Sequence, residues 1–448
     1  MSTSEQETLE LNDVASPVER KLWMFGLMWF GQLVSGIGSG LTSFALGVWV
    51  YEQTGSAAKF TFIAFLGALP SLILLPIAGA LVDRWDKRWT MLLSDTGSAV
   101  AILSMLLLTV SGSLRIWHIY CCVIWLSISG TFGLLAYYPA ITLSVPKRLL
   151  GRVSGMTYAS QATAQIASPL LGGLMIALLG LKTIFVTDFV TFLFSITTLA
   201  LIRIPKVQAQ GGDKVRPSII KEAIYGWTYI KERSSLLLLL FYFASTNFVL
   251  TIALALFAPM ILSAGTPQLL GTLNSISGVG LLTGSLVMSA WGGPRDRIQG
   301  VLGFGLLVAG GLILTGLRPQ VLIIAPAVFA IYFAIPIVNG CSQALWQCKT
   351  APELQGRVFS LRRMIATSMA PLSFLLAGRL SDHLFEPMLA KGGLLSDSVG
   401  RILGVGPGRG IGSIFVLAGI FTIVIQIVAF RLPTLRLAES LLPDAISD

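Results

Sequence analysis

Twelve apolar runs, each 20 to 30 residues long, cover most of this 448-residue chain. A helix needs about 20 apolar residues to cross the hydrocarbon core of a bilayer, so every run is long enough to span it. Only 12% of the residues are charged, against about 25% in an average soluble domain, which excludes a water-soluble globule. The sequence therefore predicts an all-α integral membrane protein with twelve transmembrane helices. The runs lie at residues 22–51, 59–82, 89–111, 116–142, 153–180, 183–204, 236–263, 268–291, 298–317, 320–346, 358–381 and 411–432.

The basic residues are unevenly divided between the loops on the two sides of the membrane. With the N-terminus in the cytoplasm, 23 of the 31 lysines and arginines fall on the cytoplasmic side. Cytoplasmic loops of membrane proteins carry such an excess, so we expect both termini in the cytoplasm and a multi-pass location in the cell inner (plasma) membrane. This distribution also explains the net charge of +10 without nucleic acid as a partner.

The runs fall into two sets of six, separated by the longest polar interruption. The predicted organisation is a cytoplasmic N-terminal tail at 1–21, a six-helix bundle at 22–204, a cytoplasmic linker at 205–235, a second six-helix bundle at 236–432 and a cytoplasmic tail at 433–448. Apolar residues in the linker recur at helical spacing, which predicts an amphipathic helix lying at the membrane interface. A simple tether is the alternative interpretation.

The two sets of six resemble each other at an offset of 205 residues. Equal numbers of helices per copy give both copies the same topology, a parallel repeat about an axis along the membrane normal. This arrangement is typical of secondary carriers whose substrate site lies between the halves. The matching pairs are Gly79 with Gly284, Gly151-Arg152-Val153 with Gly356-Arg357-Val358, and Gly172-Gly173 with Ala377-Gly378.

The loop after the second run has a glycine, an acid four residues later and then basic residues. The glycine permits close helix packing, and a carboxylate at Asp83 could cap the positive end of a neighbouring helix. This pattern resembles the gating loop between helices 2 and 3 of the major facilitator superfamily. The resemblance implies a contact of Asp83 with helix 11, where Arg362 and Arg363 could be its ion partners; a solvated basic loop is the alternative. The gating residues are Gly79, Asp83, Arg84 and Arg88.

The fifth run carries small residues around a proline, which let a helix press closely against a partner. Their spacing resembles the antiporter motif of the same superfamily, with Ala164 and Ser168 in place of two of its glycines, and it implies export. An ordinary tight helix contact is the alternative. Segments 145–147 and 404–410 further resemble the branch of macrolide-efflux and enterobactin-exporter proteins, which implies a bulky amphipathic natural product as substrate. The motif residues are Gly155, Ser168, Pro169, Gly172 and Gly173.

Polar side chains within the runs are the candidates for a substrate path. Helices 1, 4, 7 and 10 line the cavity in the superfamily, and by that resemblance their amides and aromatic rings should contact substrate. A cavity of this kind without fixed charge would suit an uncharged or weakly charged amphipathic ligand. Hydrogen bonding between helices is an equally good reason for each amide. The candidates are Gln32, Asn247, Asn339, Gln343 and Tyr137.

Two acids, Asp95 and Asp188, lie inside the third and sixth runs. Ionisable groups within a membrane are expensive and mark functional sites by default, so both are candidates for proton coupling. Structural acids paired with hydroxyl or backbone groups are the alternative. The arginine that many drug-proton antiporters carry in helix 4 is absent between Trp117 and Ala140, so a proton route through that helix is in doubt.

The sequence predicts a secondary active exporter of small amphipathic organic molecules that works by alternating access, with proton antiport as the driving force. We expect a monomer whose partners are the substrate, the proton and the lipid bilayer, with no cofactor. Four cysteines without a CxxC pair and two histidines give no expected metal site. An uptake carrier of the same fold is the first rival. A membrane-embedded transferase is the second; it would use Asp382, His383 and Glu386 but leaves the repeat unexplained.

Overall fold

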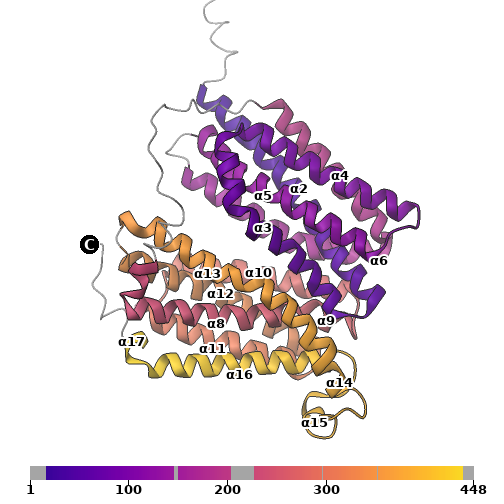
Figure 1. Ribbon diagram of the computed structural model, residues 1–448, viewed down its shortest axis with the longest axis vertical. Helices are drawn as coiled ribbons and strands as arrows, with labels where there is room; N and C mark the ends of the chain where they lie inside the picture. The colour runs from indigo at the N-terminus through magenta and orange to yellow at the C-terminus, as the bar shows by residue number, and fades with distance from the viewer. Residues whose placement is uncertain (1–16, 146–149, 203–226, 295, 351, 437–448) are drawn as a thin grey trace, which may run out of the picture. The chain divides into compact units, whose positions relative to one another are not determined.

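The computed structural model describes residues 17–145, 150–202, 227–294, 296–350 and 352–436 (Figure 1). Every regular element in these ranges is a helix. Eleven of the helices in the described ranges are long and apolar enough to cross a membrane, which confirms the predicted all-helical membrane fold. Most of the predicted linker helix and both predicted tails lie outside the described residues.

Eleven spanning helices accommodate twelve predicted segments because α6 contains two of them. Its 52 residues include Gly180, where the backbone turns to φ 74° and ψ 175°. Glycine adopts a positive φ without the steric penalty of a side chain, so one residue suffices to join the fifth and sixth predicted segments. The helices of this part are α2 (Pro17–Thr54), α3 (Ala57–Arg84), α4 (Lys87–Val110), α5 (Ile116–Ser144) and α6 (Leu150–Leu201).

The remaining segments form the later helices. α8 and the short α9 together cover the seventh predicted run, and short helices after α13 cover the connection to the last span. The elements are α8 (Ser234–Ala255), α9 (Phe257–Leu262), α10 (Pro267–Trp291), α11 (Arg297–Leu317), α12 (Val321–Lys349), α13 (Pro352–Leu380), the π-helix η2 (Ser381–Phe385), α14 (Glu386–Leu389), α15 (Val399–Leu403), α16 (Arg409–Arg431) and α17 (Pro433–Arg436).

Short polar loops fix where several helices begin. The side chains of Asp86, Thr266 and Asp296 accept hydrogen bonds from backbone N–H groups three residues later, at the starts of α4, α10 and α11. These bonds satisfy donors that have no partner inside a helix. Capping residues in the loops therefore set the ends of the spans more sharply than hydropathy does.

Contacts divide the chain into two compact units. The first holds the described residues within 1–45, 69–168 and 178–210, and the second those within 46–68, 169–177 and 211–448. The second unit therefore includes the junction of α2 with α3 and a short part of α6 in addition to the later helices. The bundle boundaries predicted from the sequence stay a prediction.

Glycines bring the helices of the second unit into backbone contact. A Cβ at Gly284 of α10 would collide with the carbonyl of Phe333 in α12, and one at Gly316 of α11 would collide with the carbonyl of Gly412 in α16. Small residues at such crossings allow the close approach that drives helix association in lipid. Figure 1 shows α11 and α16 lying side by side along their lengths.

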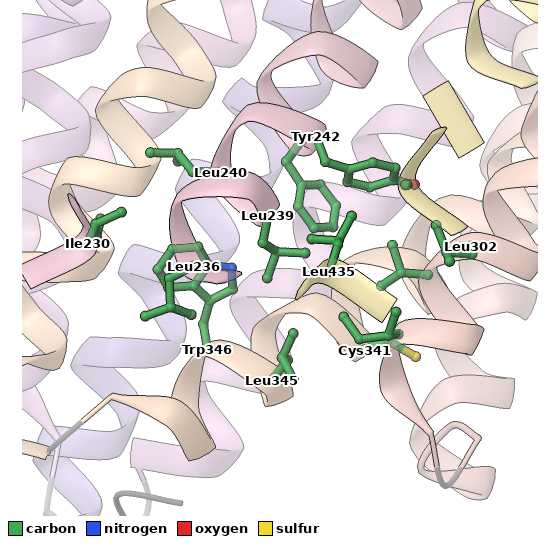
Figure 2. Close-up of a cluster of buried hydrophobic side chains, with 14 of the residues drawn as sticks. Ile230, Leu236, Leu239, Leu240, Tyr242, Leu302, Cys341, Leu345, Trp346 and Leu435 are labelled. Atoms are coloured by element: carbon green, nitrogen blue, oxygen red, sulfur yellow. The ribbon is translucent and has the colours of Figure 1, made fainter. Parts of the chain in front are cut away.

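A cluster of buried apolar side chains joins α8, α11 and α12 near the C-terminal end of α12. Figure 2 shows its central members, among them Leu236 and Leu239 of α8 and Leu345 and Trp346 of α12. Trp346 is completely buried. This cluster fixes the position of α12, which also carries the polar residues Asn339 and Gln343.

Candidate functional site

The two glycines related by the 205-residue offset make matching contacts within the second unit. A Cβ at Gly173 of α6 would lie 2.7 Å from the carbonyl oxygen of Pro267, at the start of α10. A Cβ at Gly378 of α13 would collide with the backbone of Ala58, at the start of α3. Each glycine thus presses its helix against the N-terminal end of another. The contact of Gly173 is thus of the kind that the alternative interpretation of the antiporter-like motif expects.

The other residues of the antiporter-like motif are also packed in α6. Ser168 is buried, and its hydroxyl donates to the carbonyl of Ile37 in α2 over 3.0 Å. Gly172 is buried as well. Pro169 lies within α6, where its carbonyl lies close to Gly271 of α10. Gly155 lies near the start of α6.

Asp382 and Glu386 cap helices rather than form a catalytic pair. Asp382 accepts a 2.6 Å bond from the Ser56 hydroxyl and bonds of 3.1 and 3.0 Å from the N–H groups of Ala57 and Ala58. It therefore stabilises the positive N-terminal end of α3. Glu386 accepts bonds from the N–H groups of Gly408 (3.2 Å) and Ile411 (3.0 Å) at the start of α16.

A cavity of about 580 Å³ lies beside these caps within the second unit. Its lining includes Tyr51 and Ser56 from the α2–α3 junction and Lys391 from the segment after α14. Both of its carboxylates are engaged by backbone donors, and no group of His, Cys, Asp and Glu side chains suited to a metal occurs among the described residues. The acids that a transferase would have used are thus helix caps.

Asp95 lies in a hydrogen-bonded network that joins three helices of the first unit. Its carboxylate accepts a 2.7 Å bond from the Ser195 hydroxyl of α6 and a 3.0 Å bond from the Gln32 amide of α2. The same Gln32 amide donates to Ser195 over 2.9 Å. Gln32, predicted as a substrate contact, is therefore engaged in bonding between helices.

Asp188 is fully buried and occupies a second site of the same kind. The Thr42 hydroxyl of α2 donates to its carboxylate over 2.5 Å, and Thr191 of α6 lies within 3.4 Å of the other carboxylate oxygen. A Cβ at Gly38 would approach this carboxylate to 2.7 Å, so α2 and α6 pack closely here. Both acids predicted for proton coupling thus have hydroxyl or amide partners.

The gating motif is described only in part. Arg88 donates to the carbonyls of Leu199 (3.0 Å) and Ala200 (2.5 Å), which lie at the C-terminal end of α6. A Cβ at Gly79 would meet no atom of the described residues within 4 Å, and the close packing expected of this glycine stays a prediction. The side chains of Asp83 and Arg84 lie outside the described residues.

A polar strip lies on α12, in contrast to the buried networks of the first unit. Asn339 and Gln343 are one helical turn apart and both are exposed. An amide within a membrane span is costly in contact with lipid, so this exposed face fits a water-filled path better than a lipid-facing surface. Asn247 of α8 and Tyr137 of α5 are half-buried, and the Tyr137 ring lies 5.9 Å from that of Tyr138.

Beside the strip lies Arg362, a cation that the resemblance gave only as a possible ion partner of Asp83. Arg362 of α13 donates to the Gln343 carbonyl oxygen over 3.1 Å and to the Ser342 hydroxyl over 2.8 Å. Its guanidinium carbon lies 5.2 Å from the ring centre of Trp346 and 5.9 Å from that of Phe243. The sequence offered one signal for this role, an arginine inside the apolar run 358–381.

Comparison with known proteins identifies the family. Residues 28–374 match the family described as Major Facilitator Superfamily. The chain belongs to this superfamily. Its members are transporters and not enzymes, and the match agrees with the predicted fold and resemblance.

Relatives within the superfamily include drug-efflux proteins. The transporter is 28% identical over 369 residues to macrolide efflux protein A of Streptococcus pyogenes, covering 80% of this chain and 90% of the relative. It is 26% identical over 375 residues to the multidrug efflux pump Tap of Mycolicibacterium fortuitum, covering 80% and 88%.

Solved structures share the fold over almost the whole chain. A bacterial homologue of the human lysosomal transporter Spinster superposes with a TM-score of 0.67 at 14% identity, covering 95% of this chain and 98% of that one. A nucleoside transporter superposes with a TM-score of 0.62 at 13% identity, covering 92% and 100%. At these identities the likeness establishes the fold alone.

Proposed function

We propose that this transporter exports small amphipathic organic molecules by alternating access, driven by proton antiport. The observation that carries the proposal is the exposed polar strip of Asn339 and Gln343 on α12, with Phe243 close to the neighbouring Arg362. Amides beside aromatic rings suit a ligand that is partly polar and partly apolar. The similarity to macrolide and multidrug efflux proteins supports export over uptake.

Purified transporter in liposomes tests the direction and the driving force. With an inside-acid gradient, as in everted vesicles, we expect accumulation of the macrolide erythromycin inside the liposomes and its release when an ionophore collapses the gradient. Empty liposomes are the control. Accumulation only under a gradient of the opposite sense would identify an uptake carrier.

Proton coupling is proposed to pass through Asp95, Asp188 or both. Their burial at the junctions of α2 with α4 and α6 supports this role, since protonation there would change how these helices bond. Asp95→Asn and Asp188→Asn are each expected to keep exchange of labelled for unlabelled erythromycin without a gradient. At least one should lose gradient-driven accumulation; if both retain it, neither acid carries the proton.

Gating is proposed to depend on Asp83, in the last turn of α3. The resemblance to the superfamily's gating loop supports this role, together with the helix-capping ability of a carboxylate. Asp83→Asn is expected to fold in normal yield but to lower turnover at least tenfold. Glu52→Gln, at an exposed position near the other end of the first span, is the matched control. Turnover equal to wild type would remove the gating role.

The orientation and oligomeric state belong to the same proposal. We propose that both termini face the cytoplasm in the inner membrane, as the distribution of basic residues indicates, and that the transporter acts as a monomer. Labelling of single cysteines introduced near Arg84 and Arg357 should reach both from the same side. Labelling from opposite sides would contradict the parallel repeat.

A further inference from the structure

Arg362 lies within α13, just before its membrane-spanning part, and its described partners are neutral. It is two residues before the apolar stretch Met364–Leu389, and its described hydrogen-bond acceptors, Gln343 and Ser342, are both uncharged. Two aromatic rings, those of Trp346 and Phe243, flank its guanidinium. A cation in such surroundings lacks the compensation that a carboxylate would give.

No described carboxylate pairs with this guanidinium. Asp296, Asp382 and Glu386, the acids of the second unit with assigned bonds, are committed to capping α11, α3 and α16. A guanidinium carries five N–H donors in a planar fork that matches a carboxylate. The two bonds from Arg362 to Gln343 and Ser342 leave donors over.

A donor of a side chain that packs near Arg362 also lacks an acceptor. Trp346 is completely buried, and its indole Nε1–H has no hydrogen-bond partner within the described part of the chain. Its ring is the one that lies 5.2 Å from the Arg362 guanidinium carbon. Buried polar groups in native proteins are nearly always satisfied, so the described residues do not saturate the donors around Arg362.

Exposed residues of α12 make the surroundings of Arg362 accessible to a ligand. Gln343, which holds the guanidinium, is exposed, and Asn339 lies exposed one turn farther along the same face. A carboxylate bound to Arg362 would therefore have the exposed amides of Gln343 and Asn339 beside it for other polar groups, while Phe243 lies buried near the guanidinium. This arrangement places polar groups for the rest of the ligand on α12, next to the cation of α13.

We propose that Arg362, supported by Gln343, binds the carboxylate of transported molecules that carry one, so that amphipathic organic anions are a substrate class beside molecules without a carboxylate, such as erythromycin. This inference rests on the proposed export function and deepens it. It adds a fixed positive charge to a path that the sequence suggested to be free of fixed charge. Ion pairing of Arg362 with Asp83 of the gating loop is the competing role.

A carboxylate probe and its uncharged amide, which have the same ring and nearly the same shape, separate these roles. We would measure binding of 2-naphthoate and its uncharged amide, 2-naphthamide, to the purified full-length transporter. Wild type should bind the carboxylate about tenfold more tightly than the amide, the size expected for a hydrogen-bonded charge pair. Arg362→Gln should remove that preference, with amide binding within twofold of wild type, whereas Arg362→Lys should retain part of it.

Arg431→Gln is the matched control, because it removes the same charge from an exposed position at the end of α16 and should leave the preference intact. Equal binding of both probes to wild type, or equal loss of both in Arg362→Gln, would overturn the carboxylate site. If neither probe binds but erythromycin is exported, the carboxylate site fails and the export function stands. If erythromycin is not exported either, the proposed function itself fails.

Discussion

Two sets of polar groups, one within the membrane spans of each unit, are used in opposite ways. In the first unit, Asp95 and Asp188 are buried, and amides or hydroxyls of neighbouring helices donate to them. In the second unit, Asn339 and Gln343 are exposed on α12, and Arg362 beside them has only neutral acceptors among the described residues. Completed networks hold helices together, whereas incomplete ones leave bonding capacity for a ligand.

From this comparison we expect the largest loss of stability when Asp95 is replaced. Asp95→Ala should lower the free energy of unfolding by about 1–3 kcal/mol, because Gln32 and Ser195 lose a shared acceptor in a buried place. Denaturation of the purified transporter in detergent micelles measures this. Ser104→Ala, which removes an exposed hydroxyl bonded only to its own helix, is the control. Unchanged stability in Asp95→Ala would mean that the network does not hold the helices.

A double change sharpens the same point. If Gln32 and Asp95 stabilise the first unit through each other, Gln32→Leu and Asp95→Leu together should cost about 1 kcal/mol less than the sum of the single changes. Removing both partners leaves neither polar group unsatisfied. Single and double variants measured by the same denaturation give the coupling energy. Strict additivity would show two independent side chains.

Thr42→Val should have a smaller effect on stability. It keeps the shape of the side chain but removes the hydroxyl that donates to Asp188, which should cost about 1 kcal/mol or less. Thr197→Val removes an exposed hydroxyl bonded within its own helix and serves as the control. Equal effects of the two changes would contradict a specific role for the Thr42 bond.

The smallest effect on stability is expected on α12. Asn339→Ala and Gln343→Ala should each change the free energy of unfolding by no more than about 0.5 kcal/mol, as at other exposed positions, while they lower transport or shift its substrate profile. Erythromycin accumulation in liposomes, measured alongside denaturation, separates the two quantities. If both variants transported like wild type, the strip would not line the path.

The sequence was sufficient to predict the fold, because the thickness of the bilayer sets the length of each apolar run and so makes the spanning helices recognisable. It also located the segment boundary at Gly180, although not that a single residue with positive φ would make the turn. Sequence reasoning could not tell the role of Gln32 from that of Gln343. Both are single amides in apolar runs, and only packing shows that one meets a carboxylate and the other an open face.

Long-range partners were likewise beyond the sequence. Nothing near Asp382 in the chain indicates that it bonds to Ser56, Ala57 and Ala58, which are more than 320 residues away. Its local cluster with His383 and Glu386 suggested catalysis instead. Arg362 was noticed for its charge, but its neighbours on α8 and α12 were needed to suggest a ligand.

The cap formed by Asp382 restricts which amino acids can occupy position 382 more strongly than it restricts positions 57 and 58, at the start of α3. Two of its three donors are main-chain N–H groups, which every amino acid except proline supplies. Residues 57 and 58 can therefore vary over evolutionary time without loss of those bonds, provided that their side chains fit. Asp382 has no such freedom, since only a short side chain with two acceptor oxygens can receive three donors at once. Related transporters should thus show variation at the start of α3 facing an invariant acid across the contact.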